Sequence, residues 1–367
     1  MLQAIGLTNF KCFKKQLFPL TSLTVLTGLN GMGKSSLLQS LLLLRQSGND
    51  PISLKSLKLN GPYVSLGSAH DILCEDADDD LFTISIKEND TEDVYCFDCS
   101  PEFSDELPRK GSSQKNTNGS IVFSDHFIYL SAYRIGPQTL YGITNKQDLE
   151  KRDLGTNGEF ALQYLKQHSN DPVSCRKMVR GEAEKAFLAL QVEAWMDLIS
   201  PGVHPIINID HEARTAVLGY EFIQDGNKTM TYKSTNVGFG ITYVLPVIIA
   251  LLSAQSGDLL LIENPEAHIH PQGQRYLGEL IARAAAAKVQ ILLETHSDHI
   301  LNGIRIAAKE DLIDADDVAL SYFTVEKGKK DPPSRTILWP KLFSNGQIDR
   351  WPEGFFDEWD NSLLALL

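Results

Sequence analysis

The sequence predicts an α/β fold that combines a mixed sheet, an antiparallel β subdomain and a short helical insertion. Three observations support this prediction. A β-prone run, a glycine-rich loop and a Leu-rich helix follow one another between Leu23 and Gln46. Two apolar strands, Leu259–Ile262 and Val289–Leu293, flank a helix at Gly273–Ala287, the order expected of parallel strands joined by a right-handed crossover. Alternating runs between these ends, such as Leu81–Lys87, predict antiparallel strands.

The composition is that of a globular protein with a sizeable core. The chain has 367 residues, of which 43% are hydrophobic and 22% are charged. Its formal net charge of −13 argues against non-specific binding of nucleic acid over the whole surface, but it does not exclude a local basic face. Five sparse cysteines and no signal peptide favour a reducing cytosol. The longest apolar run, Tyr243–Leu252, is about half of the ~18 residues needed to cross a bilayer, so we expect a cytoplasmic protein without membrane contact.

The N-terminal half is expected to be rich in β structure around one helix. The expected strands of this half are Ala4–Phe10, Leu23–Thr27, Leu81–Lys87, Val94–Cys99, Ile121–Phe123 and Phe127–Ser131. The first helix is expected at Ser36–Arg45, followed by a loop-rich stretch at Gln46–Asp71. The polar stretch Ser104–Gly119 is expected to be a mobile loop.

The second half begins with a change of character. Residues 157–199 carry helical periodicity and are expected to form an inserted helical lobe. The expected strands after it are Pro205–Asp210, Ala216–Gln224, Thr229–Lys233 and Ala319–Glu326, with a tight turn at Asp225–Asn227. In the C-terminal tail, residues 336–367, an aromatic cluster either docks the tail on the rest of the chain or binds a partner. Its members are Trp351, Phe355, Phe356 and Trp359.

Gly28, Gly33, Lys34 and Ser35 fit the phosphate-binding loop pattern G-x-x-x-x-G-K-[ST]. Such a P-loop needs a strand before it and a helix after it, because backbone N–H groups and the helix N-terminus converge on one anion. Lys34 would reach the β- and γ-phosphates of a nucleoside triphosphate, and the Ser35 hydroxyl would bind Mg²⁺. The competing interpretation is a Gly-rich turn that happens to precede a helix.

Three features near the other end could complete a nucleotide site. The turn Ser234–Gly240 opens the helix Ile241–Leu252, either as a second anion-binding N-terminus or as an ordinary N-capped helix. Glu263 follows the apolar strand Leu259–Ile262, at the strand end where ligands bind in parallel sheets, and could hold Mg²⁺. His296 comes just after the next strand, where it could sense a γ-phosphate, although a lone histidine is more often structural.

These motifs, in this order, resemble those of ABC-type ATPase heads of the SMC, RecF and OLD class. Gly28–Ser36 matches their Walker A form, and Asp258–Pro271 resembles their extended Walker B. Ser234–Gly240 stands where their signature motif stands, and Thr295–Ser297 resembles their switch histidine. More narrowly, the segments ENPEAHIHPQGQ, ETHSDHILNGIR and WPEGFFDEW are similar to those of small bacterial ATPases with relatives in antiphage defence operons, such as the Septu, PARIS and retron-associated ATPases.

The resemblance implies a single ABC-type ATPase head over residues 1–367 that binds ATP and Mg²⁺. Two heads of this class sandwich two ATP molecules, each P-loop facing the signature helix of the other subunit, and hydrolysis releases the dimer. The metal ligands that it implies are Ser35 and Glu263, and the catalytic residues are Glu263, Asn264, Glu266 and His296. The implied nucleotide-binding residues are Asn30, Gly31, Gly33, Lys34, Ser35, Ser36, Asn236, Gly238, Gly240 and Lys11, the last near the base.

One position departs from the family pattern. Most ABC heads carry a glutamate directly after the Walker B acid, whereas this sequence carries Asn264. Because an amide can orient water but cannot accept its proton, Glu266 or Glu263 would have to serve as the base. The departure therefore predicts slow hydrolysis, gated by a partner.

Three functions are left open. The first is an ATP-dependent dimer that controls an effector in antiphage defence; the short tail is too small for a nuclease or toxin domain, so we expect the effector in a separate chain. The second is a DNA-repair ATPase of the RecF or SMC type, for which DNA binding is possible but not indicated by the acidic charge. The third, suggested by Asn264, is a nucleotide-bound scaffold with negligible hydrolysis.

Overall fold

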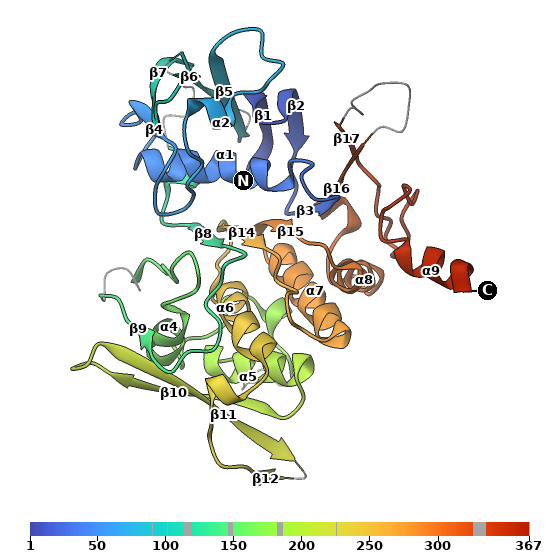
Figure 1. Ribbon diagram of the computed structural model, residues 1–367. Helices are drawn as coiled ribbons and strands as arrows, with labels where there is room; N and C mark the ends of the chain where they lie inside the picture. Colours follow the sequence, from blue (N-terminus) through green and yellow to red (C-terminus); the bar gives the residue numbers. More distant parts are fainter. Residues whose placement is uncertain are drawn as a thin grey trace. The chain divides into compact units, whose positions relative to one another are not determined.

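The computed structural model describes residues 1–89, 91–100, 102–113, 119–145, 150–181, 186–224, 226–325 and 335–366 (Figure 1). The chain divides into two compact units. Unit 1 comprises residues 1–127, 318–341 and 348–367, and unit 2 comprises residues 128–317 and 342–347. Both ends of the sequence thus belong mainly to unit 1, and the prediction of one head over residues 1–367 stays a prediction.

Unit 1 contains a six-stranded antiparallel sheet in the order β2-β1-β5-β6-β7-β4. Its strands are β1 (Leu2–Phe10), β2 (Phe13–Pro19), β4 (Ser56–Lys58), β5 (Leu81–Glu88), β6 (Thr91–Asp98) and β7 (Glu106–Ser113). In β5, the buried residues Phe82, Ile84 and Ile86 alternate with more exposed ones, so one face of the sheet covers the core. The predicted antiparallel β subdomain and its hairpin of β5 and β6 are confirmed.

Three strands of this sheet, β2, β4 and β7, were not predicted. β2 pairs with β1 across a two-residue turn in which Lys11 has a φ of 49°, and it buries Phe13 and Phe18 against the core. β7 lies within Ser104–Gly119, for which the prediction of a mobile loop is wrong over Glu106–Ser113; residues 114–118 lie outside the described residues. Buried Leu107 holds this polar strand on the sheet.

A second, mixed set of strands in unit 1 carries the P-loop. β16 (Val318–Val325) is parallel to β3 (Leu23–Gly28) and antiparallel to β17 (Arg335–Leu338), which confirms the predicted mixed sheet. The last residue predicted for β16, Glu326, lies outside the described residues. The helices of unit 1 are α1 (Lys34–Ser47), α2 (Ala69–Ile72) and α9 (Glu358–Leu366).

Two further predictions for unit 1 need correction. Ile121–Phe123 is a 3-10 helix, η1, and not a strand, because the Ser120 hydroxyl accepts a hydrogen bond from the Val122 N–H and caps a tight turn. The stretch Gln46–Asp71 is mostly loop, as expected, but it also contains the short strand β4 and most of α2.

The C-terminal tail packs on β16 within unit 1. The Phe355 side chain is fully buried, and its ring centroid lies 5.1 Å from that of Tyr322. The Tyr322 hydroxyl donates a hydrogen bond to the Glu353 carbonyl. Trp351 and Phe356 contact the Phe355 ring, whereas the side chain of Trp359 lies outside the described residues.

Unit 2 contains two parallel strands, β14 (Leu259–Glu263) and β15 (Gln290–Glu294), with β8 (Phe127–Leu130) beside β14. The helix α7 (Pro271–Ala286) connects the two parallel strands, as predicted, and packs against α8 (Asp298–Lys309). The apolar helix α6 (Phe239–Ser253) begins two residues earlier than expected. Because the parallel register pairs Glu263 with Glu294, both strands end at the same edge of the sheet.

The remainder of unit 2 is a helical region followed by a long β-hairpin (Figure 1). Its elements are β9 (Tyr141–Gly142), α4 (Ala161–Gln167), η2 (Arg176–Met178), α5 (Leu188–Ile199), β10 (Val203–Asp210), β11 (Thr215–Gln224), β12 (Asn227–Lys228), β13 (Tyr232–Lys233), η4 (Ser234–Asn236) and η5 (Ala315–Asp317). The prediction of one strand over Thr229–Lys233 is wrong, because only its last two residues pair with β11. In the predicted turn, Asp225 lies outside the described residues, as do residues 182–185 of the predicted helical lobe.

Candidate functional site

The P-loop of unit 1 joins β3 to α1. Gly28, Gly31 and Gly33 have φ values of 130°, 75° and 101°, in the left-handed region that favours glycine. α1 begins at Lys34, with Gly33 at its N-cap, so the N-terminus of the helix lies at the end of the loop. The sequence folds this way because glycines permit the turn and the Leu-rich helix that follows buries its apolar side chains. This is the geometry that binds a phosphate group.

Neighbouring segments of unit 1 pack tightly around two of these glycines. A Cβ atom on Gly28 would lie 2.0 Å from the carbonyl oxygen of Phe323 in β16. A Cβ atom on Gly33 would lie 2.5 Å from the Cys12 Sγ and 2.6 Å from the Phe13 ring. Gly31, in contrast, has no atom within 4 Å of such a Cβ. The two flanking glycines are therefore required by packing as well as by backbone conformation.

The Lys34 ammonium lies inside the P-loop. The side chain is 4% exposed, and its Nζ donates to the carbonyl oxygens of Gly28, at 2.9 Å, and Leu29, at 2.8 Å. Ser35 is half-buried beside it, whereas Asn30 and Gly31 are exposed on the rim of the loop and Ser36 is buried in the first turn of α1. A buried ammonium, a neighbouring hydroxyl and a helix N-terminus fit a triphosphate with Mg²⁺.

Lys11 lies in the turn between β1 and β2. Its Nζ donates to the Gln39 Oε1 of α1 at 2.6 Å, and burial lowers its pKa below the ordinary lysine value. The ammonium is thus attached to the helix that follows the P-loop. Its predicted position near the nucleotide base stays a prediction.

In unit 2, Glu263 ends β14 with its carboxylate held in a fixed orientation. One oxygen accepts from the Tyr129 hydroxyl at 3.1 Å, and the other accepts from the Ala132 N–H at 3.2 Å. Burial raises the pKa of Glu263, and these two hydrogen bonds oppose that rise. An oriented and largely desolvated carboxylate at this strand end can bind a cation.

Asn264 follows in a strained conformation, with a φ of 43°. Its N–H donates to the Glu294 carbonyl of β15 at 2.8 Å. Its side-chain Oδ1 is buried and has no hydrogen-bond partner among the described residues. A buried acceptor without a partner lowers the free energy of unfolding, so this oxygen is a candidate acceptor for a hydrogen bond from a bound water.

Glu266 connects the two strand ends of unit 2. Its Oε1 accepts from the backbone N–H of His296 at 2.8 Å, whereas its buried Oε2 has no hydrogen-bond partner among the described residues. Burial raises the pKa of Glu266, opposed by hydrogen bonds from the His296 N–H and the Thr295 hydroxyl. A buried carboxylate with a raised pKa and one oxygen to spare suits a general base.

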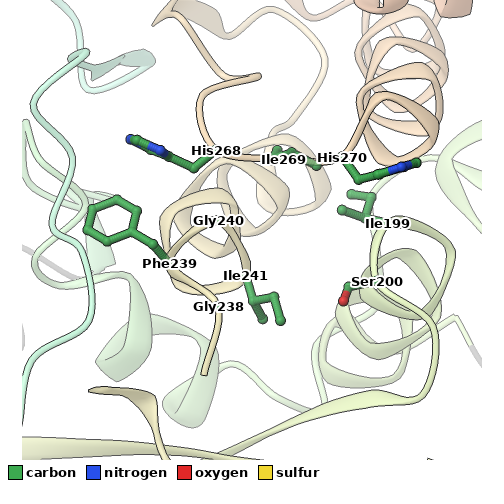
Figure 2. A pocket seen from close by; sticks show the side chains of 9 residues that line it. All are labelled: Ile199, Ser200, Gly238, Phe239, Gly240, Ile241, His268, Ile269 and His270. Carbon is green, nitrogen blue, oxygen red and sulfur yellow. The ribbon is translucent and has the colours of Figure 1, made fainter. Parts of the chain in front are cut away.

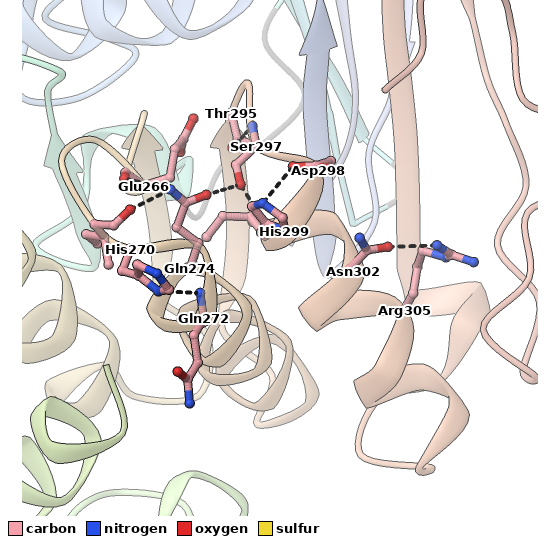
Figure 3. A network of polar contacts seen from close by, with 12 residues as sticks. Glu266, His270, Gln272, Gln274, Thr295, Ser297, Asp298, His299, Asn302 and Arg305 are labelled. Atoms are coloured by element: carbon pink, nitrogen blue, oxygen red, sulfur yellow. Dashed lines mark hydrogen bonds and ion pairs between the residues drawn. The ribbon is translucent and has the colours of Figure 1, made fainter. Parts of the chain in front are cut away.

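The turn that carries His296 is held by a polar network (Figure 3). The Ser297 hydroxyl accepts from the Ile300 N–H and caps α8, and it donates to the Gln274 Oε1 of α7. The Gln274 amide donates to the Ile269 carbonyl at 2.7 Å. The network leaves the His296 side chain exposed just past β15. The structure thus brings Glu263, Asn264, Glu266 and His296 together in unit 2.

The predicted signature turn borders an open pocket of about 360 Å³ (Figure 2). α6 starts at Phe239, after the exposed residues Asn236 and Gly238. A Cβ atom on Gly240 would lie 2.0 Å from the His268 carbonyl oxygen, so the first turn of α6 touches the loop after β14. The pocket is lined by Ile199, Ser200, Gly238, Phe239, Gly240, Ile241, His268, Ile269 and His270.

Three residues that contact or face the strand end of β14 were not among the predicted site residues. Tyr129 donates to Glu263, Arg134 contacts the backbone after β14, and Glu294 is buried opposite Glu263 in the β14–β15 register. Glu294 had a signal in the sequence, because it ends a buried strand. Tyr129 lies in β8 and Arg134 follows that strand, more than a hundred positions before β14, and no spacing pattern connects them to β14.

Comparison with known families identifies the class of protein. A family model described as an AAA ATPase domain matches residues 1–187, about half of the chain. The chain belongs to this AAA ATPase domain family. A second AAA domain model, named for the AbiEii toxin of type IV TA systems, matches residues 144–302, and a model described as a protein of unknown function (DUF3696) matches residues 313–366. This AAA ATPase is therefore a nucleotide-binding protein of the P-loop type.

One curated relative of this AAA ATPase is an OLD nuclease from Thermus scotoductus, 22% identical over 330 residues. The match covers 81% of this chain and 59% of the relative, so the chain spans about three-fifths of that nuclease. The family match and this relative confirm the prediction of an ATPase of the SMC, RecF and OLD class. No helix in the described part of the chain has the length and apolarity needed to span a membrane.

Solved structures of SMC heads show a looser likeness. An SMC head bound to the C-terminal winged-helix domain of ScpA is 12% identical, with a TM-score of 0.49 over 93% of this chain and 98% of that one. The SMC head domain from Thermotoga maritima is 12% identical, with a TM-score of 0.43 over 92% and 98% of the two chains. The mixed and antiparallel sheets described above fit a P-loop NTPase head.

Proposed function

We propose that this AAA ATPase hydrolyses ATP slowly, dimerises when ATP is bound, and in that state controls a separate nuclease or toxin in bacterial antiphage defence. The observation that carries the proposal is the turn after β14, where Asn264 occupies the position directly after Glu263. An amide in this position can orient water but cannot accept a proton. The next carboxylate, Glu266, has one buried oxygen without a described partner, and it is the base that the geometry favours.

In the proposed reaction each motif has one task. Lys34 donates to phosphate oxygens instead of the loop carbonyls, and the first turn of α1 donates its N–H groups. Ser35 and Glu263 would hold Mg²⁺, which would neutralise charge on the phosphates. Asn264 orients the attacking water, and Glu266 accepts its proton while the exposed His296 donates to the γ-phosphate. The water oxygen bonds to the γ-phosphorus as the bond to the leaving ADP oxygen breaks, which releases ADP and phosphate.

Phosphate release from purified protein tests the reaction. We expect a rate below about 1 s⁻¹, under the usual range of enzymes, and its loss in Lys34→Ala. Lys15→Ala, which changes an exposed lysine of β2, is the matched control and keeps the wild-type rate. Release by Lys34→Ala at the wild-type rate would place the activity outside this P-loop.

Dimerisation through ATP is supported by the exposed start of α6. Asn236 and Gly238 precede the helix, and no side chain caps it, so its N-terminal dipole can attract an anion. Light scattering with a non-hydrolysable ATP analogue should show a mass of two chains, and one chain in its absence. Lys34→Ala should remain a monomer under both conditions.

Control of an effector is supported by the names of two matches. The curated relative is called a nuclease and is longer than this chain, and one AAA model is named for a toxin. The complex purified with the product of a neighbouring gene, with and without ATP, tests this part. A composition that does not respond to ATP contradicts control by nucleotide.

Two other functions have distinct outcomes. A DNA-repair role would require DNA affinity that falls steeply with salt, against a net charge of −13. A scaffold without hydrolysis would bind ATP through Lys34 and release no phosphate within hours.

A further inference from the structure

Arg134 is a buried arginine directed at the backbone of the turn after β14. Its side chain is 4% exposed, and its guanidinium is bound by carbonyl groups. One nitrogen donates to the carbonyl oxygens of Ser131, at 2.7 Å, and Glu263, at 2.6 Å. The other terminal nitrogen, Nη2, donates to the carbonyl oxygen of Asn264 at 2.7 Å. The guanidinium therefore binds two consecutive peptide groups of the turn that carries the proposed catalytic residues.

These hydrogen bonds restrain a backbone that is otherwise unfavourable. Asn264 has a φ of 43°, a conformation that costs a non-glycine residue on the order of 1 kcal/mol. Hydrogen bonds from a charged donor are stronger than neutral ones, and the planar guanidinium presents its donors in a fixed geometry that a lysine lacks. Fixing both carbonyl groups sets the orientation of the peptide between Glu263 and Asn264. It thereby sets where the side chains of this turn point.

The same guanidinium also contacts α6. Its central carbon lies 4.2 Å from the centroid of the Tyr243 ring, and the Tyr243 hydroxyl donates to the Ala132 carbonyl oxygen. The Ala132 N–H in turn donates to the Glu263 carboxylate. Residues 131–134 are thus bound on one side by the turn after β14 and on the other by the helix that begins at Phe239. All of these contacts lie within unit 2.

We propose that Arg134 is a positioning residue for ATP hydrolysis, which holds the turn Glu263–Glu266 in its reactive shape through the carbonyl groups of Glu263 and Asn264. This inference rests on the proposed function. Arg134 itself touches neither phosphate nor water in the proposal. Its loss should slow the chemical step and leave the binding of ATP intact, because the P-loop residues that bind phosphate belong to unit 1.

The first experiment compares Arg134→Met with Arg180→Met in the full chain. Arg180 is the matched control, since it also stacks on an aromatic ring, that of Trp195, but pairs with Glu279 on α7. We expect Arg134→Met to lower the single-turnover rate about 100-fold, the effect of misplacing reacting groups by about 1 Å. The dissociation constant of a fluorescent ATP analogue should change less than about threefold. Arg180→Met should keep both values, and Arg134→Lys should recover part of the rate.

Hydrogen exchange gives a second readout that does not depend on hydrolysis. The Asn264 N–H donates to Glu294, and the His296 N–H donates to Glu266, so both amides are protected while the turn holds its shape. Arg134→Met should exchange both amides faster and leave the β10–β11 hairpin unchanged. Arg134→Lys gives the same comparison, to a smaller extent, if the methionine variant does not fold.

Each outcome decides between the two proposals. A wild-type protein that binds ATP but releases no phosphate contradicts the proposed function, while the exchange of the two amides still decides the role of Arg134. Hydrolysis and exchange that are unchanged in Arg134→Met overturn the role of Arg134 and leave the ATPase intact. A rate that falls together with ATP affinity, or falls equally in Arg180→Met, shows a general structural role and also overturns the inference.

Discussion

Replacing Glu266 by glutamine removes a negative charge from the turn after β14 and keeps its shape. The Oε1 that accepts from the His296 N–H at 2.8 Å is retained as an amide oxygen, so the connection between the two strand ends survives. What is lost is the basic carboxylate oxygen Oε2, which is buried and has no described hydrogen-bond partner. The substitution therefore separates the chemical role of Glu266 from its structural one.

The expected loss of rate follows from the role of a general base. Such a base contributes about 10²–10⁴-fold, equivalent to roughly 2.7–5.4 kcal/mol of activation free energy. The stability should not fall, because burial raises the pKa of Glu266 and so disfavours its ionised form in the folded protein at neutral pH. A neutral amide avoids this cost, and the melting temperature of Glu266→Gln should equal or exceed that of the wild type.

Single-turnover phosphate release, with protein in excess over ATP, measures the chemical step directly. Binding of a fluorescent ATP analogue should be unchanged, because Glu266 lies outside the P-loop. Glu279→Gln is the matched control: Glu279 is also a buried glutamate of unit 2, but it pairs with Arg180 and Arg283. This control should lose stability and keep the rate.

A rate in Glu266→Gln within about threefold of the wild type would refute the assignment of Glu266 as the base. In that case Glu263 would be the remaining carboxylate of the turn, and Glu266 would serve only to orient the His296 turn. Glu266→Ala distinguishes the two roles, since it removes the acceptor of the His296 N–H as well.

Two further predictions concern glycines with close neighbours. Gly33→Ala should abolish ATP binding in a titration with a fluorescent analogue, because the new Cβ would overlap two side chains packed beside the P-loop. Gly31→Ala has open space around its Cβ and should weaken ATP binding about tenfold or less, through backbone strain alone. Gly240→Ala should lower the free energy of unfolding by about 3 kcal/mol in a denaturant titration, because its Cβ would overlap the His268 carbonyl oxygen; Gly142→Ala, an exposed glycine without close neighbours, should change it by less than about 0.5 kcal/mol. Equal effects within either pair would contradict the packing argument.

Elements with a strong apolar pattern could be predicted from the sequence. β14 was predicted because Leu259–Ile262 form an apolar run. β15 was predicted one residue early, because its apolar run begins at Val289 while pairing begins at Gln290. β7 could not be predicted, since Leu107 is the one deeply buried side chain among residues 106–111, where burial is described, and the strand pairs with the distant segments β4 and β6.

The candidate site divides in the same way. The P-loop was predictable because all of its expected phosphate-binding residues lie within nine consecutive positions. The hydrogen bond between Glu266 and the His296 N–H depends on the register of two parallel strands, which spacing alone does not set. Arg134 had no signal, because its partners are backbone carbonyl groups, and any residue type carries those.

Two consecutive residues of β16 connect the P-loop of unit 1 to the C-terminal tail. The Phe323 carbonyl accepts from the Leu29 N–H of the P-loop, and Tyr322, next to it, contacts Phe355 of the tail. If bound ATP changes the position of Phe323, it changes the free energy with which the tail is held. Linkage is reciprocal, so a partner that takes hold of the tail would change the affinity for ATP by the same factor by which ATP changes the affinity for that partner.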